Sequence, residues 1–169
     1  MDIVRLSIPY SFLHDRCRPT WRSIRFGLEN ELLDPRAAVE FAVDGVTETD
    51  TPSPDLLDLA GSSKSDPIAE LVGRLAAAEP EFPEAKLHDE WLYLVLAWLY
   101  EHRNEYTDPL QRVEEVYADF GYPERVAGFV RYMPMGGPDL GSREANERRL
   151  FDKWQEYLED VDRSPRTPV

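Results

Sequence analysis

The sequence predicts an all-α fold, a single compact domain of about eight or nine helices around a central apolar helix. Three observations lead to this prediction. The pair Asp-Pro, a favourable helix start, recurs at residues 34, 66 and 108, each time before apolar residues at helical spacing. Residues 91–100 are apolar on every side, as in a helix enclosed by other helices. Strand-like alternation occurs only in residues 3–8, which we expect to form one short strand or an ordered N-terminal arm.

The first helices are predicted from their caps. Residues 9–16 favour a short helix, and Thr20 suits the N-cap of a second helix over 21–30, because its hydroxyl can accept an unpaired backbone N–H. Asp34 caps a third helix that begins at Pro35. The apolar stripe expected to face the core in this third helix consists of Val39, Ala42, Val43 and Val46.

Loops and helices alternate through the middle of the chain. Residues 47–54 are rich in Thr, Ser and Pro and predict a loop, which a short helix over 54–60 follows. Asp66 and Pro67 open the next helix, and a central helix is expected over 84–104. The inward-facing residues expected before the central helix are Ile68, Leu71, Val72 and Leu75.

Three more helices are expected in the last third. One begins at Asp108, one at Tyr122-Pro123, and a long last helix is capped by Ser142. The recurring Asp-Pro pair leaves open whether the helices form a loose repeat arrangement or simply share a good start signal. We expect one helical domain over residues 1–162 and a flexible tail over 163–169. The expected inward residues are Leu110, Val113, Val116, Tyr117, Phe120, Val126, Phe129, Val130, Met133, Leu150, Trp154, Tyr157, Leu158 and Val161.

Composition excludes several classes of protein. The chain has 33 Asp and Glu against 19 Lys and Arg, a formal net charge of −14, which argues against nucleic-acid binding through phosphate contacts. The single Cys excludes a disulfide framework and a multi-Cys zinc site. No signal peptide is recognisable, and the longest apolar run would rise only about 15 Å as a helix, half the thickness of a membrane core. We therefore expect a cytoplasmic protein without a membrane partner.

The negative charge is concentrated in two stretches. Residues 37–63 contain six acids and no Lys or Arg, and residues 81–124 contain eleven acids against three basic residues. Such stretches attract a basic partner, although a merely solvated acidic surface is the simpler interpretation. The candidate partner-binding residues are Glu40, Asp44, Glu48, Asp50, Asp55, Asp58, Glu114, Glu115 and Asp119.

No catalytic or metal-binding motif stands out. His14 and Cys17 are three residues apart, but no third group is identifiable that would orient them for nucleophilic catalysis. His88 and His102 are too far apart along one helix, about 21 Å, to bind one metal ion. Gly136-Gly137 lacks the following Lys and Ser or Thr of a phosphate-binding loop. We expect a protein that is not an enzyme and has no cofactor or metal.

Several stretches of the chain resemble one bacterial family. They are Ile8-Pro-Tyr-Ser-Phe-Leu, Phe26-Gly-Leu-Glu-Asn-Glu-Leu-Leu, Trp91-Leu-Tyr-Leu, Val116-Tyr-Ala-Asp-Phe-Gly-Tyr-Pro-Glu and Phe129-Val-Arg-Tyr-Met-Pro. On these residues the chain resembles the domain of unknown function 2247 family over most of residues 8–134. The resemblance implies no chemistry, because the family has no established activity and no catalytic residues to transfer.

Three hypotheses about function follow. By analogy with other small acidic bacterial families, the first is an immunity protein that neutralises a basic toxin domain, with salt-sensitive association. The alternative is an intracellular adaptor or scaffold that binds partners through an apolar groove, and such binding would withstand salt. The third is an enzyme whose site combines scattered acids with His88 or His102, which tight binding of a divalent metal would support.

Overall fold

The computed structural model describes residues 5–164, and within that range it contains nine α-helices, one 3-10 helix and a single isolated β-bridge. The all-α class predicted from the sequence is confirmed. The chain divides into two compact units, here named the N-terminal unit (Arg5–Trp91) and the C-terminal unit (residues 92–164). The boundaries of the single domain expected over 1–162 stay a prediction.

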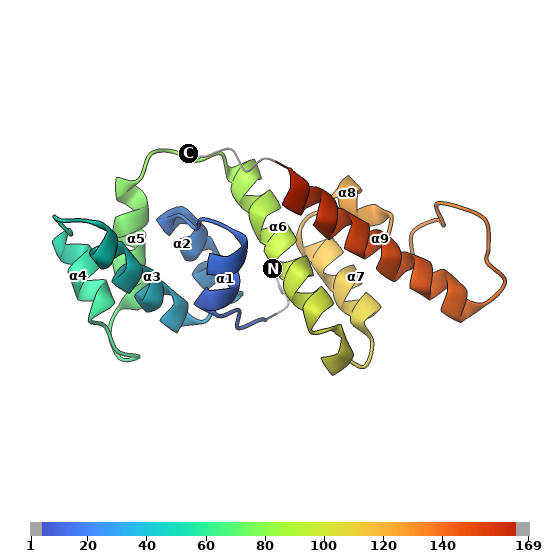
Figure 1. The fold of residues 1–169 in the computed structure, drawn as a ribbon, viewed down its shortest axis with the longest axis horizontal. Helices are drawn as coiled ribbons and strands as arrows, with labels where there is room; N and C mark the ends of the chain where they lie inside the picture. Colours follow the sequence, from blue (N-terminus) through green and yellow to red (C-terminus); the bar gives the residue numbers. More distant parts are fainter. Residues whose placement is uncertain (1–4, 165–169) are drawn as a thin grey trace. The chain divides into compact units, whose positions relative to one another are not determined.

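Five helices and the start of a sixth form the N-terminal unit. Helix α3 packs against α1 and α4, and α5 packs against α2 and α4; Figure 1 shows α3 between α4 and α1. The predicted caps are present: the Thr20 side chain accepts from the Ser23 N–H, and the Asp34 carboxylate accepts from the Arg36 N–H. The helices are α1 (Tyr10–Arg16), α2 (Trp21–Glu29), α3 (Pro35–Glu48), α4 (Pro54–Ala60), α5 (Ile68–Ala78) and α6 (Glu84–Glu101), whose residues through Trp91 belong to this unit.

The segment before α1 has a partner that the sequence did not reveal. Ile8 forms a parallel bridge with Leu33, and its N–H donates to the Leu32 carbonyl at 3.0 Å. The Asp34 N–H in turn donates to the Ile8 carbonyl at 3.0 Å. Residues 3–4 of the expected strand lie outside the described residues. The short arm therefore pairs with the α2–α3 connection through backbone hydrogen bonds.

Two details of the N-terminal unit differ from the prediction. Helix α3 buries Ala37, Ala38 and Ala42, whereas Val43, expected in its core stripe, is 46% exposed. The small alanine side chains allow the neighbouring helices to approach closely on that side of α3. Asp66 does not cap α5, because its carboxylate accepts from the Ser63 backbone N–H and hydroxyl instead.

The core of the N-terminal unit is built around Trp91. This side chain is fully buried, its Nε1 donates to the Ser23 carbonyl at 2.9 Å, and its ring stacks with that of Phe26. The Ser23 hydroxyl donates to the Glu90 carboxylate at 2.7 Å, so the one buried polar side chain in the described core has a partner. Gly27 provides the space that the Trp91 ring occupies.

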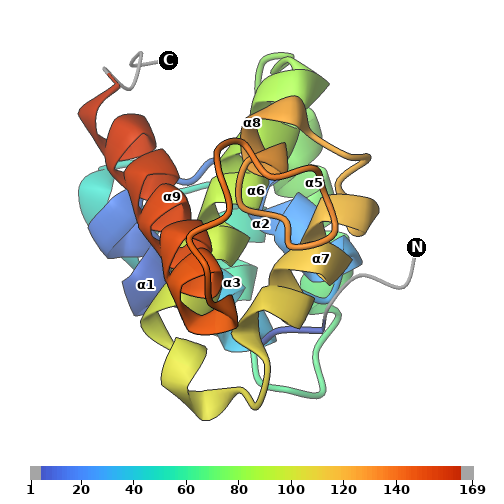
Figure 2. The ribbon, with the colours of Figure 1, turned by 90° about the vertical axis from the view of Figure 1, so that its right-hand side faces the viewer.

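The C-terminal unit contains the rest of α6 and the helices that follow it. Of the run predicted to be enclosed, the side chains from Trp91 to Ala97 and Leu99 are buried, whereas Trp98 and Tyr100 are partly exposed. The remaining elements are the 3-10 helix η1 (Arg103–Glu105), α7 (Pro109–Asp119), α8 (Glu124–Ala127) and α9 (Arg143–Arg163). Figure 2 shows α9 beside the long loop that precedes it. Trp154 of α9 is fully buried, with its ring near those of Phe129 and Tyr100.

The helix predicted from Tyr122-Pro123 through Met133 is much shorter in the structure. Helix α8 has only four residues, and the chain then forms tight turns in which the Phe129 and Val130 amides donate three residues back. Gly128, a poor helix former, follows the last helical residue. At the end of the chain Arg163 still belongs to α9, and residues 165–169 of the expected tail lie outside the described residues.

Candidate functional site

Three of the predicted partner-binding acids form a row on α3. Glu40, Asp44 and Glu48 are spaced by four residues, which places them on one side of the helix. The Tyr10 hydroxyl from α1 donates to the Asp44 carboxylate at 2.5 Å. Burial raises the pKa of the Tyr10 phenol, and the Asp44 hydrogen bond and the negative charges of the three acids raise it further. The carboxylates of the row therefore lie close enough to act on one hydroxyl group.

The other acids of the N-terminal unit differ in how far they are neutralised. Asp55 of α4 forms an ion pair with Arg74 of α5 at 3.0 Å, and Glu70 binds the same guanidinium at 2.8 Å. By contrast, four exposed acids form no salt bridge within the described chain. They are Glu40, Glu48, Asp50 and Asp58. We name these four residues and Asp44 the acidic face.

The predicted acids of the C-terminal unit are in a different situation. Glu114 pairs with Arg131 at 3.1 Å, and Glu115 pairs with Arg112 at 2.8 Å. Asp119 is partly buried at the end of α7. Two of these three predicted residues thus have their charge compensated by a neighbouring arginine, unlike most of the acidic face.

Arg131 links several elements of the C-terminal unit. Its guanidinium also binds the Asp108 carboxylate at 3.0 Å, and that carboxylate accepts from the Gln111 N–H as the N-cap of α7. The Arg131 hydrogen bond is the main reason why the pKa of Asp108 lies below its usual value. Through these interactions Arg131 connects the N-terminus of α7 with the segment that follows α8.

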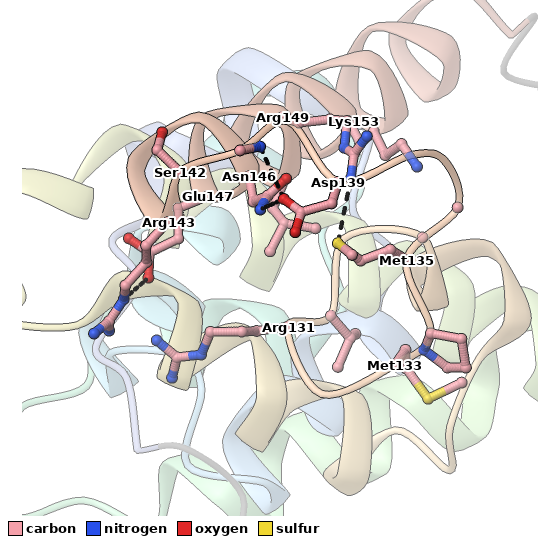
Figure 3. A pocket seen from close by; sticks show the side chains of 16 residues that line it. Arg131, Met133, Met135, Asp139, Ser142, Arg143, Asn146, Glu147, Arg149 and Lys153 are labelled. Carbon is pink, nitrogen blue, oxygen red and sulfur yellow. Dashed lines mark hydrogen bonds and ion pairs between the residues drawn. The ribbon is translucent and has the colours of Figure 1, made fainter.

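A basic pocket, not predicted from the sequence, lies between α9 and the loop before it (Figure 3). Its volume is about 490 Å³, and Arg131, Arg143, Arg149 and Lys153 contribute to its lining. We name it the C-terminal pocket. The only signal in the sequence was the four-residue spacing of Arg149 and Lys153 on the last predicted helix, which places both on one side of α9.

Comparison with known families gives a match over most of the chain. The model of a family described as uncharacterized proteins conserved in bacteria, DUF2247, matches residues 10–162. The chain belongs to the DUF2247 family. This confirms the resemblance seen in the sequence and extends it to the loop over 47–63 and to α9. No significant match was found among curated proteins or solved structures.

The matched range of this DUF2247 protein includes both candidate sites. The acidic face and the C-terminal pocket lie entirely between residues 10 and 162. The family description assigns no activity, so the function has to be inferred from the geometry of these sites.

The structure shows the surroundings of three residues that were considered for catalysis in this DUF2247 protein. The His14 ring meets the Tyr10 ring edge-on at 5.7 Å, and the His102 ring stacks on Trp98 at 3.8 Å. Cys17 follows α1 and is partly buried. Among residues 5–164 no group of three His, Cys, Asp or Glu side chains is placed to hold a metal ion. A search of the same residues finds no helix long and apolar enough to cross a membrane.

Proposed function

We propose that this DUF2247 protein is a cytosolic, non-enzymatic binding protein whose acidic face receives a basic protein partner, as an immunity protein receives a toxin domain. The observation that carries the proposal is the row of Glu40, Asp44 and Glu48 on α3, two of which are exposed and form no salt bridge with the described residues. Its carboxylates would occupy the positions at which a toxin that acts on nucleic acid binds phosphates.

Electrostatics favour the acidic face over the acids of the C-terminal unit. Glu114 and Glu115 each bind an arginine. Because the positive charge of the arginine compensates the carboxylate, such a pair attracts a basic partner only weakly. Exposed carboxylates without such a neighbour create a negative potential that speeds the approach of a basic surface. Because dissolved ions screen this attraction within about 10 Å at 0.1 M salt, the association should weaken as salt is added.

Charge reversal on the acidic face tests the proposal. The test variant is Glu40→Lys, Glu48→Lys and Asp58→Lys. Asp55 is left unchanged because a lysine there would face Arg74. The matched control is Glu124→Lys, Asp152→Lys and Glu156→Lys, three exposed acids of the C-terminal unit. Both triple variants change the net charge equally, so a difference between them reports position rather than total charge.

The tagged wild-type chain and both variants are used to capture partners from a bacterial lysate, and elution with a salt gradient precedes mass spectrometry. We expect the wild type and the control to capture a basic protein that moderate salt releases. The test variant should bind this protein at least about tenfold more weakly. With that protein in hand, co-expression with the wild-type chain should protect cells from its toxicity. A partner that all three chains bind equally well would contradict a role for the acidic face.

A second candidate function is an adaptor that binds through apolar surface. A pocket of about 630 Å³ lies in the N-terminal unit and includes Pro35, Val39 and Ile68 in its lining. Val43 and Leu57 are large apolar residues that are about half exposed on α3 and α4. Binding through this pocket would withstand high salt and would be lost in a Val39→Asp variant, so the same elution experiment separates the two candidates.

A further inference from the structure

The C-terminal pocket holds two cations whose charge is not compensated by a salt bridge. Arg131 and Arg143 also line it, but Arg131 binds Asp108 and Glu114, and Arg143 binds Glu147 at 2.9 Å. Arg149 and Lys153 form no salt bridge with a carboxylate anywhere in residues 5–164. Both cations belong to α9, where their four-residue spacing places them on one side of the helix.

The loop before α9 holds these two cations close to its backbone. Arg149 donates to the Pro138 carbonyl at 2.8 Å and to the Met135 sulfur at 3.5 Å, both neutral acceptors. A Cβ atom at Gly136 would lie 2.8 Å from the Lys153 Nζ, and one at Gly137 would lie 3.1 Å from an Arg149 nitrogen. Glycine at both positions therefore leaves room for the two cationic groups beside the loop.

Asp139 also lines the pocket, but its carboxylate is hydrogen-bonded to other groups. Its carboxylate accepts from the Asn146 side chain at 2.8 Å and from the Gly141 N–H at 2.9 Å. These two bonds are the main reasons why the pKa of Asp139 lies below its usual value, with a smaller contribution from the charge of Arg149. Asp139 thus fixes the loop to α9 and does not form a salt bridge with either cation.

The remaining lining of the pocket is largely apolar. Val130, Met133 and Leu150 contribute to it, and Figure 3 shows the sulfur of Met135, a residue of the loop, directed toward Arg149. A volume of about 490 Å³ is in the range that holds a small organic molecule. The pocket therefore combines a cationic end with an apolar wall.

We propose that the C-terminal pocket binds a small organic oxyanion, a phosphate or carboxylate attached to an apolar body. Arg149 and Lys153 hold the oxyanion through charge-assisted hydrogen bonds, and the apolar body lies against Met133 and Leu150. The guanidinium of Arg149 suits either oxyanion because its planar donors match both geometries. This site is independent of the acidic face, since it lies in the other unit and attracts the opposite charge.

Calorimetry with the full chain tests this site at constant ionic strength. The probes are phenyl phosphate, 3-phenylpropionate, inorganic phosphate and the uncharged 3-phenylpropanol. The test variant is Arg149→Gln with Lys153→Gln. The control is Arg148→Gln with Lys86→Gln, which removes the same charge from exposed positions outside the pocket. A Gly136→Asp variant places a carboxylate beside Lys153 on an exposed loop, and it tests the site without altering α9.

We expect saturable binding of at least one organic oxyanion by the wild type and the control, and binding about tenfold weaker or worse in the test and Gly136→Asp variants. The tighter of phenyl phosphate and 3-phenylpropionate identifies the anionic group. The proposal is overturned if neither saturates by about 10 mM, if the test variant binds as the control does, or if 3-phenylpropanol binds equally well. Inorganic phosphate binding as tightly as phenyl phosphate would overturn the role of the apolar wall.

Discussion

Each unit of the molecule has a fully buried tryptophan, and the two differ in how the indole is held. Trp91 of the N-terminal unit donates its N–H to the Ser23 carbonyl. Its ring packs against Gly27, where a Cβ atom would clash with it. Trp154 of the C-terminal unit packs among aromatic rings, and its N–H has no acceptor within the described chain. A hydrogen bond therefore helps to orient the buried indole of Trp91, whereas the indole of Trp154 is held by packing alone.

The units also differ in the state of their charges. The N-terminal unit exposes acids such as Glu40 and Glu48 that form no salt bridge, whereas in the C-terminal unit Glu114 and Glu115 bind arginines. In the C-terminal unit two cations that line the pocket, Arg149 and Lys153, form no salt bridge with a carboxylate among residues 5–164. Although the chain has a net charge of −14, the two units carry local groups of exposed charge of opposite sign. Which charges lack a partner becomes known only from the folded structure.

The largest stability effect is expected at the contact between Gly27 and Trp91. A Cβ atom at Gly27 would clash with the buried indole ring, so Gly27→Ala should destabilise the protein by about 1–3 kcal/mol. Gly73 in α5 is the matched control, because no atom outside its own helix backbone lies within 4 Å of a Cβ placed there. Gly73→Ala should stabilise by about 0.5–1 kcal/mol.

Urea denaturation followed by circular dichroism measures both changes. Opposite signs for the two glycine substitutions would support the tight packing around Trp91. A Gly27→Ala variant as stable as the wild type would show that the Trp91 ring can move aside, and the contrast between the two units would lose its basis.

The next prediction compares the two tryptophans directly. Trp91→Phe and Trp154→Phe remove the same volume from equally buried sites, but only the first also removes a hydrogen bond. We expect Trp91→Phe to cost about 1 kcal/mol more free energy of unfolding than Trp154→Phe, the usual net value of one hydrogen bond. Equal costs in the same denaturation experiment would indicate that the Ser23 bond contributes nothing beyond packing.

Much of the fold could be predicted because its signals are local. The side chains of Asp34 and Asp108 accept amides two and three residues later, so their effect depends on the adjacent sequence alone. The length of the apolar run of α6 and the Glu, Lys and His residues that flank it favour a helix over a buried strand. The buried side of α3 could not be predicted, because the helix has apolar residues on more than one side and its neighbours determine which of them are covered.

The candidate sites depended on contacts that the sequence does not encode locally. Asp55 and Arg74 are 19 residues apart, and only the packing of α4 on α5 brings them together. Lys153 likewise lies beside Gly136 because the long loop returns to α9. The acids of the row on α3 could be predicted as candidates by their type, but which acids an arginine neutralises could not be predicted.

A smaller effect is expected at the cap of α7. Asp108→Ala removes both the N-cap and the ion pair with Arg131 and should cost about 1 kcal/mol. Asp108→Asn keeps a good cap and removes only the partly exposed pair, so it should cost a few tenths of that amount, roughly 0.3 kcal/mol. Similar losses in both variants would mean that the cap is unimportant.

The pair of Asp108 with Arg131 also predicts a dependence on pH. The folded-state pKa of Asp108 lies below the ordinary value of 3.8, so the ion pair stabilises the folded protein fully above that value. This contribution disappears as the pH falls from 3.8 through the lower folded-state pKa. Urea titrations at decreasing pH should therefore show the wild type and Asp108→Asn converging, whereas a constant difference would assign the effect to another interaction.

A similarly small effect is expected where the acidic face meets Tyr10. Tyr10→Phe removes the hydrogen bond to Asp44, which is only partly buried, and should cost about 0.5 kcal/mol at neutral pH. Because the folded-state pKa of Tyr10 is raised above the ordinary 10.0, its contribution is present below pH 10.0 and is lost as the pH rises further. The wild type should therefore lose its advantage over Tyr10→Phe in that alkaline range.

A double-mutant cycle with Asp44→Ala assigns this effect to its partner. If the Asp44 carboxylate is the group that holds the Tyr10 hydroxyl, Tyr10→Phe should cost nothing further once Asp44 is alanine. An unchanged cost in that background would place the effect in another contact of Tyr10, such as its ring contact with Phe41. The cycle also shows whether Asp44 is held by α1 or is available to a partner, which distinguishes it from the exposed Glu40 and Glu48 of the same row.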